Sequence, residues 1–189
     1  TVANGLGLPL PEKAKAAVTP KADLPPSDAL SIVKNGPDNF AGRKLGLLVS
    51  DGADAALVKA LMDAVKAADA LCEVIAPKIG GATLSDGTLL PAQQKIDGGP
   101  SVLYDAVAVI VSDEGAALLS KDAPSKDFVA DAFAHCKFMG LSPEAKPLLV
   151  NAGIAEDLDD GCLGLESADD AKAFVAALGP LRFWDRESK

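Results

Sequence analysis

The sequence contains few of the residues that usually bind cofactors or metals. Its 189 residues include one histidine, one tyrosine, one tryptophan and three cysteines, and only 4% are aromatic. Cys72, Cys136 and Cys162 are widely spaced and form no C-x-x-C pair, so neither a disulfide framework nor a zinc site is predicted. With so few aromatic residues, the core is expected to consist mainly of Ala, Val and Leu.

Basic clusters and long apolar runs are also missing. The formal net charge is −9 and Lys and Arg do not cluster, which argues against nucleic acid as a partner. No apolar run approaches about 20 residues, and the N-terminus has no leader pattern, so no membrane association is predicted. We expect a soluble chain of undetermined compartment. Because it starts at Thr1 and not at Met, we expect a processed or excised piece.

Proline is unevenly distributed, which divides the chain into two parts. Six of the thirteen prolines lie in the first 37 residues. Proline removes backbone donors and biases its neighbours away from helix. We therefore expect residues 1–42 to form a Pro-rich arm or linker, loosely packed over residues 1–27, and residues 43–189 to form one domain.

After Gly42, buried strands and amphipathic helices alternate, which predicts an α/β fold. "KLGLLVS" (44–50) and "LCEVIAP" (71–77) flank a helix whose apolar residues recur at spacings of three and four, so they form a βαβ unit with parallel strands. The pattern predicts a flavodoxin-like, doubly wound, mainly parallel sheet with helices on both faces. Further strands are expected at 104–112, 137–141 and 162–166, a hairpin at 80–94, and helices at 114–120, 125–136, from Pro143, and 167–179.

Sites in such sheets form beyond the carboxyl ends of the strands, here after Ser50, Pro77, Ser112 and Leu141. The turn "SDGADAA" (50–56) could hold a phosphate, but its two aspartates and the missing glycine motif favour a helix cap, with Asp54 as the cap of the helix that follows. Asp113 and Glu114 could pair for acid–base work or hold a cation. They fit the start of a helix better, because the helix dipole favours carboxylates there.

The turn after Leu141 resembles a nucleophile elbow, the strained strand-to-helix turn that raises a catalytic residue. Ser142 lies at this turn, but a serine nucleophile needs a base within hydrogen-bond reach. His135, the sole histidine, precedes the strand and should lie roughly 20 Å away at the rise of a strand. We therefore expect Ser142 to be a helix N-cap followed by Pro143, and His135 and Cys136 to form a partly buried helix end.

These blocks together resemble the C-terminal domain of large-subunit catalases, part of the ThiJ/PfpI group of glutamine-amidotransferase-like folds. The resemblance covers about residues 28–185 and includes "GRKLGLLVSDGADAALVKALMDAVKAADALCEVIAPKIGG" and "DFVADAFAHCKFMGLSPEAKPLL". It also implies a fungal source. In active members the elbow reads G-K-P-V-A-A-I-C-H-G-P. That alignment puts Pro143 at the nucleophile, Glu144 at the histidine and Leu57 at the acidic partner, so the elbow would be a remnant.

The resemblance further implies that the chain carries no catalytic, cofactor-binding or metal-binding residues of its own. In the family, haem is bound by a tyrosinate in R-x-x-x-Y within another domain. Tyr104 is the sole tyrosine here, and Pro100 stands in place of that arginine. The implied function is a non-catalytic accessory domain of a haem catalase that decomposes hydrogen peroxide in the oxidative stress response. Its implied partners are the catalase core and other subunits of a homotetramer.

The resemblance also implies that this domain stabilises the tetramer and can act as a chaperone-like holder of unfolded clients, as heat-shock relatives in the same superfamily do. Two other functions are kept as alternatives. The chain could be a free-standing ThiJ/PfpI-type hydrolase or glyoxalase that uses Cys or Ser. It could also be a flavin- or nucleotide-binding flavodoxin-like protein.

Overall fold

A computed structural model describes residues 2–188, and the chain divides into two units, one ending at Asn35 and one beginning at Gly36. The first unit is extended, and nearly all its side chains are exposed to solvent. It contains helix α1 (Val2–Gly5) and the 3-10 turn η1 (Asp28–Leu30), neither of which buries a residue. Near its end, Lys34 forms an ion pair with Asp28 at 2.5 Å.

Within the described residues of the second unit, a six-stranded sheet has the order β5-β2-β1-β6-β7-β8, with every pairing parallel. Strands β3 and β4 form a separate antiparallel hairpin. The doubly wound parallel sheet predicted from the sequence is therefore confirmed. The strands are β1 (Lys44–Val49), β2 (Leu71–Ala76), β3 (Ala82–Thr83), β4 (Leu89–Leu90), β5 (Gln94–Lys95), β6 (Ala106–Ile110), β7 (Met139–Leu141) and β8 (Cys162–Gly164).

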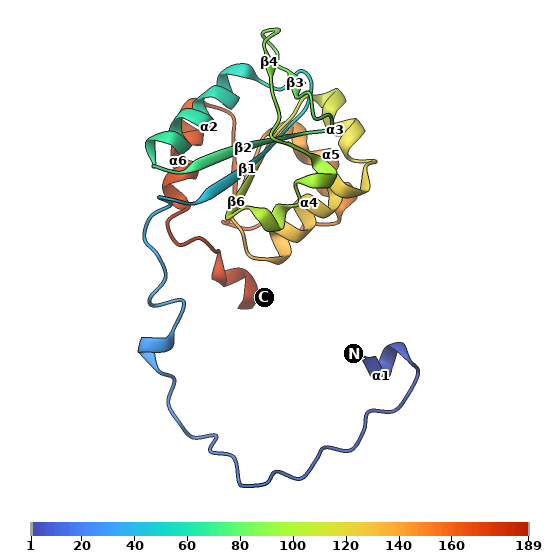
Figure 1. Ribbon diagram of the computed structural model, residues 1–189, viewed down its shortest axis with the longest axis vertical. Coiled ribbons are helices and arrows are strands. Elements are labelled where there is room, and N and C mark those ends of the chain that lie inside the picture. Colours follow the sequence, from blue (N-terminus) through green and yellow to red (C-terminus); the bar gives the residue numbers. More distant parts are fainter. Residues whose placement is uncertain (1, 189) are drawn as a thin grey trace. The chain divides into compact units, whose positions relative to one another are not determined.

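Helices cover both faces of this sheet (Figure 1). Helices α2 and α6 pack together on one face, and α3, α4 and α5 pack on the other, which gives two apolar clusters separated by the sheet. None of the helices described between residues 2 and 188 is long and apolar enough to cross a membrane. The helices of this unit are α2 (Ala55–Ala67), α3 (Asp113–Leu119), α4 (Ala123–Ala134), α5 (Lys146–Ala152) and α6 (Ala168–Ala177), with 3-10 turns η2 (Ile96–Gly98), η3 (Ser101–Leu103), η4 (Pro143–Ala145) and η5 (Trp184–Ser188).

The apolar runs in the sequence explain why the central strands form, and one glycine shows how tightly these strands are packed. Strands β1 and β6 are buried on both faces, as expected for parallel strands covered by helices. A Cβ built on Gly46 in β1 would lie 2.5 Å from Cδ2 of Tyr104. The buried Tyr104 ring therefore occupies the space that a side chain at position 46 would need.

Three local features differ from the sequence expectations. Strand β5 was not predicted, because its two residues show no apolar pattern and are fixed by pairing with β2. The helix expected from Pro143 begins as the 3-10 turn η4 and becomes α-helical only at Lys146. Helix α4 begins before the predicted residue 125, because Asp122 accepts a hydrogen bond from the Ser125 amide at 3.0 Å.

Candidate functional site

Strand β7 leads directly into the elbow that the sequence singled out. Ser142 follows Leu141 with extended backbone angles, and Pro143 takes the first position of η4, as expected. The Ser142 hydroxyl does not cap this helix, however. It accepts the Val111 amide at 3.4 Å, while the Ser142 amide donates to Val109 O at 2.9 Å. The expected side-chain cap is wrong because the hydroxyl faces the end of β6, where the Val111 amide lies just beyond the strand.

Beside the elbow, at the carboxyl ends of β1, β6 and β7, lies a hollow of about 300 Å³. We call it the elbow hollow. Ser142 and Glu144 reach it from the elbow, and Leu57 reaches it from α2. Pro143 instead lines a neighbouring hollow with Lys146 and Leu149. The described residues that line the elbow hollow are Gly52, Asp54, Leu57, Ser85, Ile110, Val111, Ser112, Asp113, Glu114, Ser142 and Glu144.

The turn after β1 contributes helix capping and loop anchoring. Asp54 accepts the Leu57 amide at 2.8 Å, so its predicted role as the cap of α2 is confirmed. Asp51 accepts the Thr83 amide at 2.8 Å and lies 3.1 Å from Lys78 Nζ, and these two contacts lower the pKa of its carboxyl group. The Ala55 amide donates to Ser85 Oγ at 3.0 Å. Several donors that could cradle a phosphate at this helix start thus have partners within the chain.

Helix α3, which follows β6, is capped by a residue that the sequence analysis did not identify. Asp113 and Glu114 lie in the first turn of α3, as expected, but Ser112 is the cap and accepts the Gly115 amide at 3.1 Å. A Ser followed by acidic residues at a strand end is a recognisable cap signal that could have identified it. Among the residues described, no group of three or more His, Cys, Asp or Glu side chains could hold a metal ion.

His135 and Cys136 lie at the opposite end of β7 from Ser142. His135 is the C-cap residue of α4, is exposed, and its Nδ1 lies 2.6 Å from Asp131 O. Cys136 is buried, with a positive φ of 54°. The expected partly buried pair is thus one exposed and one buried residue. The structure does not bring the sole imidazole to the elbow hollow.

Of the three thiols and the tyrosine, Cys136 and Tyr104 are buried, and Cys72 and Cys162 are partly buried. Cys72 and Cys136 form no disulfide, and Cys162 Sγ lies 3.6 Å from Arg186 Nη2. Burial raises the pKa of the Cys72 thiol to about 12, and burial together with nearby Glu187 raises that of Cys136. The buried Tyr104 donates to Glu73 Oε2 at 3.2 Å. Burial and the Glu73 carboxylate raise the pKa of Tyr104, which disfavours a tyrosinate.

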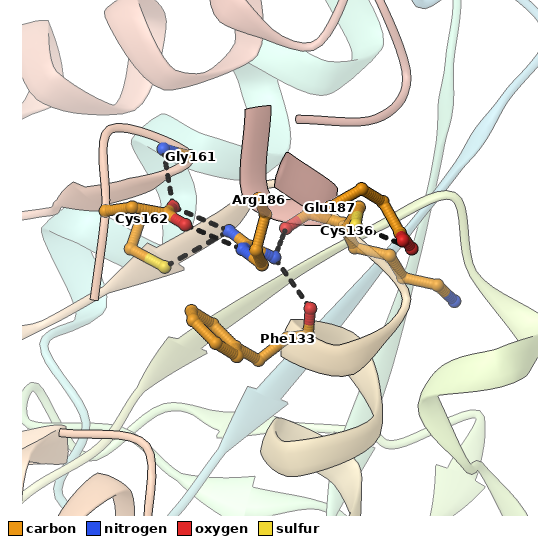
Figure 2. A network of polar contacts seen from close by, with 8 residues as sticks. Phe133, Cys136, Gly161, Cys162, Arg186 and Glu187 are labelled. Atoms are coloured by element: carbon orange, nitrogen blue, oxygen red, sulfur yellow. Dashed lines mark hydrogen bonds and ion pairs between the residues drawn. The ribbon is translucent and has the colours of Figure 1, made fainter. Parts of the chain in front are cut away.

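A buried ion pair near the C-terminus was missed by the sequence analysis (Figure 2). The Arg186 guanidinium meets the Asp159 carboxylate with two contacts of 2.8 Å, and the two side chains are only 7% and 3% exposed. The same guanidinium donates to Phe133 O and Lys137 O and lies 4.1 Å from the centre of the Phe133 ring. One arginine thus joins the C-terminal segment to the end of α4 and to the loop before β8. No motif in the sequence signals this arrangement.

Comparison with known proteins adds family information to this geometry. Residues 41–188 match the family model of the C-terminal domain found in long catalases. The chain is 54% identical over 187 residues to Catalase C of Rhizobium meliloti, covering 98% of this chain and 26% of that protein. It is 34% identical over 191 residues to Catalase HPII of Pseudomonas putida, covering 99% and 26%. The chain therefore spans about a quarter of the length of these curated relatives. Both are bacterial, so they give no support to the fungal source expected from the sequence.

Solved structures with the same fold come from the DJ-1 group. A DJ-1 superfamily protein of Salmonella typhimurium matches with a TM-score of 0.61 and 16% identity, over 72% of this chain and 88% of that one. Oxidized DJ-1 of Toxoplasma gondii matches with a TM-score of 0.62 and 13% identity, over 78% and 95%. At these identities the likeness concerns the fold alone, and it confirms the flavodoxin-like α/β class. The family model and the two catalase relatives show that the chain belongs to the family of C-terminal domains of long catalases.

Proposed function

We propose that this chain is a non-catalytic accessory domain of a large haem catalase, and that it stabilises the catalase oligomer. Its partners would be the haem-bearing core and the other subunits of a homotetramer. The parent enzyme would decompose hydrogen peroxide in the oxidative stress response, with its haem held outside this chain.

The non-catalytic part of this proposal rests on one observation, the set of residues that line the elbow hollow. Ser142 is 4% exposed and its hydroxyl accepts the Val111 amide, and the hollow presents carboxylates but no imidazole among its described lining residues. Leu57 lies where the resemblance expects an acid. A serine or cysteine nucleophile loses most of its rate without a base to activate it. The geometry thus supports an elbow whose backbone turn is present but whose catalytic base and acidic partner are missing.

A chimera tests the proposal. This chain would replace the matching C-terminal quarter of Rhizobium meliloti Catalase C, to which it is 54% identical. We expect the chimera to keep the turnover per haem of the core and to inactivate at a higher temperature than the core alone. The isolated chain, mixed with haem, should leave the Soret band of free haem unshifted and release no more oxygen from peroxide than haem alone does. Equal heat inactivation of chimera and core, or oxygen release by the isolated chain, would contradict the proposal.

The first unit supports a second role, chaperone-like holding of unfolded chains. Large apolar side chains are strongly exposed along its whole length, and such surfaces bind other apolar chains. We propose that these residues either cover the catalase core or hold unfolded clients. These apolar residues are Val2, Leu6, Leu8, Leu10, Val18, Leu24, Leu30, Ile32 and Val33.

Aggregation assays with a heat-denatured client distinguish these two uses of the first unit. The full chain would be compared with residues 36–189 alone and with a variant whose exposed apolar arm residues are changed to Ser. A holding activity should be lost in both variants and kept in Ser142→Ala and Cys136→Ala, because it depends on distributed apolar surface. If neither the chain nor its variants slow client aggregation, the holding role is wrong.

A further inference from the structure

A second cavity, of about 230 Å³, lies beside the elbow hollow at the carboxyl ends of β1, β2 and β5. We call it the lysine-rimmed cavity. Glu114 lines both spaces, so they adjoin at the first turn of α3. The elbow residues Ser142 and Glu144 line only the elbow hollow. The lysine-rimmed cavity is therefore separate from the degenerate elbow, although both occupy the end of the sheet where ligands bind in doubly wound folds.

Much of the lining of this cavity is apolar. Ile96 and Leu119 are buried within the fold, whereas Leu118 is 69% exposed although it also lines the cavity. Gly115 lines it without a side chain, because a Cβ there would lie 1.9 Å from Ser50 Oγ. An exposed leucine beside buried apolar residues offers a surface on which an apolar body could pack.

Two lysines line this space from neighbouring strand ends. Lys78 follows β2 and Lys95 ends β5. Lys78 lies 3.1 Å from Asp51 and Lys95 lies 2.7 Å from Asp97, and all four side chains are exposed. Exposed ion pairs contribute only about 0–1 kcal/mol, so both ammonium groups can exchange these partners for another anion at little cost.

Two of the carboxylates that line the cavity are engaged in holding the backbone. Asp51 accepts the Thr83 amide at 2.8 Å, and Asp122 accepts both the amide and the hydroxyl of Ser125. Glu114 lies on the α3 side, and β1 and β2 stand between β6, which precedes α3, and β5, which ends in Lys95. An anionic group is therefore best placed at the β2 and β5 ends, away from Glu114.

From this arrangement we propose that the lysine-rimmed cavity binds a small organic monoanion with an apolar body. Its carboxylate lies between Lys78 and Lys95, and its body packs against Ile96, Leu118 and Leu119. The cavity is smaller than the roughly 300–1,000 Å³ of most ligand sites, which limits the ligand to a small molecule. This site does not depend on the accessory-domain function proposed above.

An NMR titration of the 189-residue chain tests the site with benzoate as the probe. Benzoate should cause saturable shifts at the amides of Ile96, Gly115 and Leu119. The neutral analogue benzyl alcohol should bind about fivefold more weakly or worse, because it lacks the charge that the lysines meet. The Lys78→Gln/Lys95→Gln double variant should weaken benzoate by a similar factor and leave benzyl alcohol unchanged. Lys59→Gln, which removes an exposed paired lysine on α2, should change neither.

Leu118→Ser provides a second, independent variant. Because this leucine is exposed, the change should leave the spectrum dispersed as in the native chain, yet weaken benzoate and benzyl alcohol together. The proposal is overturned if benzoate causes no saturable shifts at these amides. It is also overturned if benzoate and benzyl alcohol bind equally to the native chain, or if the double lysine variant binds benzoate as well as the native chain does.

Discussion

At the scale of single residues, Arg186 anchors the C-terminal segment through buried polar contacts. Its guanidinium forms a bidentate pair with Asp159 inside the protein and donates to two backbone carbonyls (Figure 2). A buried ion pair need not stabilise a fold more than apolar packing would, but removing one partner leaves an uncompensated charge inside. The consequence of losing this arginine is therefore large and specific.

Arg186→Leu should lower the free energy of unfolding by about 3–5 kcal/mol, because the Asp159 carboxylate stays buried after the opposite charge of the guanidinium is removed. Urea denaturation followed by circular dichroism measures this change. Lys172→Leu is the matched control: it breaks an ion pair with Asp169 in which both side chains are exposed, so it should shift stability by less than about 1 kcal/mol. Equal effects of the two substitutions would show that the buried pair has no special role.

Lys137 is the second residue whose chemistry depends on burial. It is 3% exposed, and its ammonium donates to the carbonyl oxygens of Ser101 and Tyr104. Burial, with a smaller effect of Arg182, lowers the pKa of Lys137 from 10.5 to about 8. Between these two values the unfolded chain holds a proton that the folded chain has released. The free energy of unfolding therefore rises with pH across this window, and the cost of the buried charge is fully present below it.

The pH dependence can be isolated with Lys137→Met. Relative to this variant, the native chain should gain about 3 kcal/mol of stability as the pH rises from 8 to above 10.5, in proportion to the pKa shift. The two carbonyls left without their donor impose a cost on the variant that does not change with pH. Urea denaturation at several pH values measures the difference. A flat difference for Lys137→Met across this pH range would refute the lowered pKa.

At the scale of elements, the sequence predicted what local pattern determines and missed what tertiary contacts determine. Strands β1 and β6 were recognisable as apolar runs, and α2 by its spacing and by its Asp54 cap. Strand β5 was not recognisable, since its two residues are ordered only by pairing with β2. The elbow could be located by its place between strand and helix. The direction of the Ser142 hydroxyl could not be predicted. It is set by a hydrogen bond from the Val111 amide, which is 31 residues away in sequence.

The elbow also carries a prediction about chemistry. Pro143→Cys should hydrolyse 4-nitrophenyl acetate no faster than a cysteine placed at an exposed control site such as Lys121. Glu144 cannot act as an imidazole and Leu57 supplies no acid, so the new thiol would lack an activating base. Burst kinetics and steady-state rates of the two cysteine variants provide the comparison. A burst confined to Pro143→Cys would mean that the elbow still supplies catalytic groups that its sequence conceals.

At the scale of the whole molecule, the two units differ in how they are held. The second unit has two apolar clusters, one on each face of its sheet, and its core includes Phe40 from the segment before β1. The first unit buries almost no side chain. Its backbone is therefore open to a protease, whereas cleavage within the second unit requires local unfolding of packed helices and strands.

Limited digestion with trypsin should follow this division. Lys13, Lys15, Lys21 and Lys34 are exposed in the first unit, and we expect cleavage there within minutes, ending in a stable fragment that begins at Asn35. Lys59 and Lys66 are also exposed, but they lie within α2, where the backbone is hydrogen-bonded and packed against the sheet. They should be cut only at the rate at which the second unit unfolds. Mass spectrometry identifies the fragments, and heat-unfolded chain shows the intrinsic rate at each lysine.

The fragment from Asn35 should melt at the temperature of the intact chain, since the removed segment buries nothing within itself. Rapid cutting between residues 50 and 110 in the native chain would show that the sheet is not held as its packing indicates.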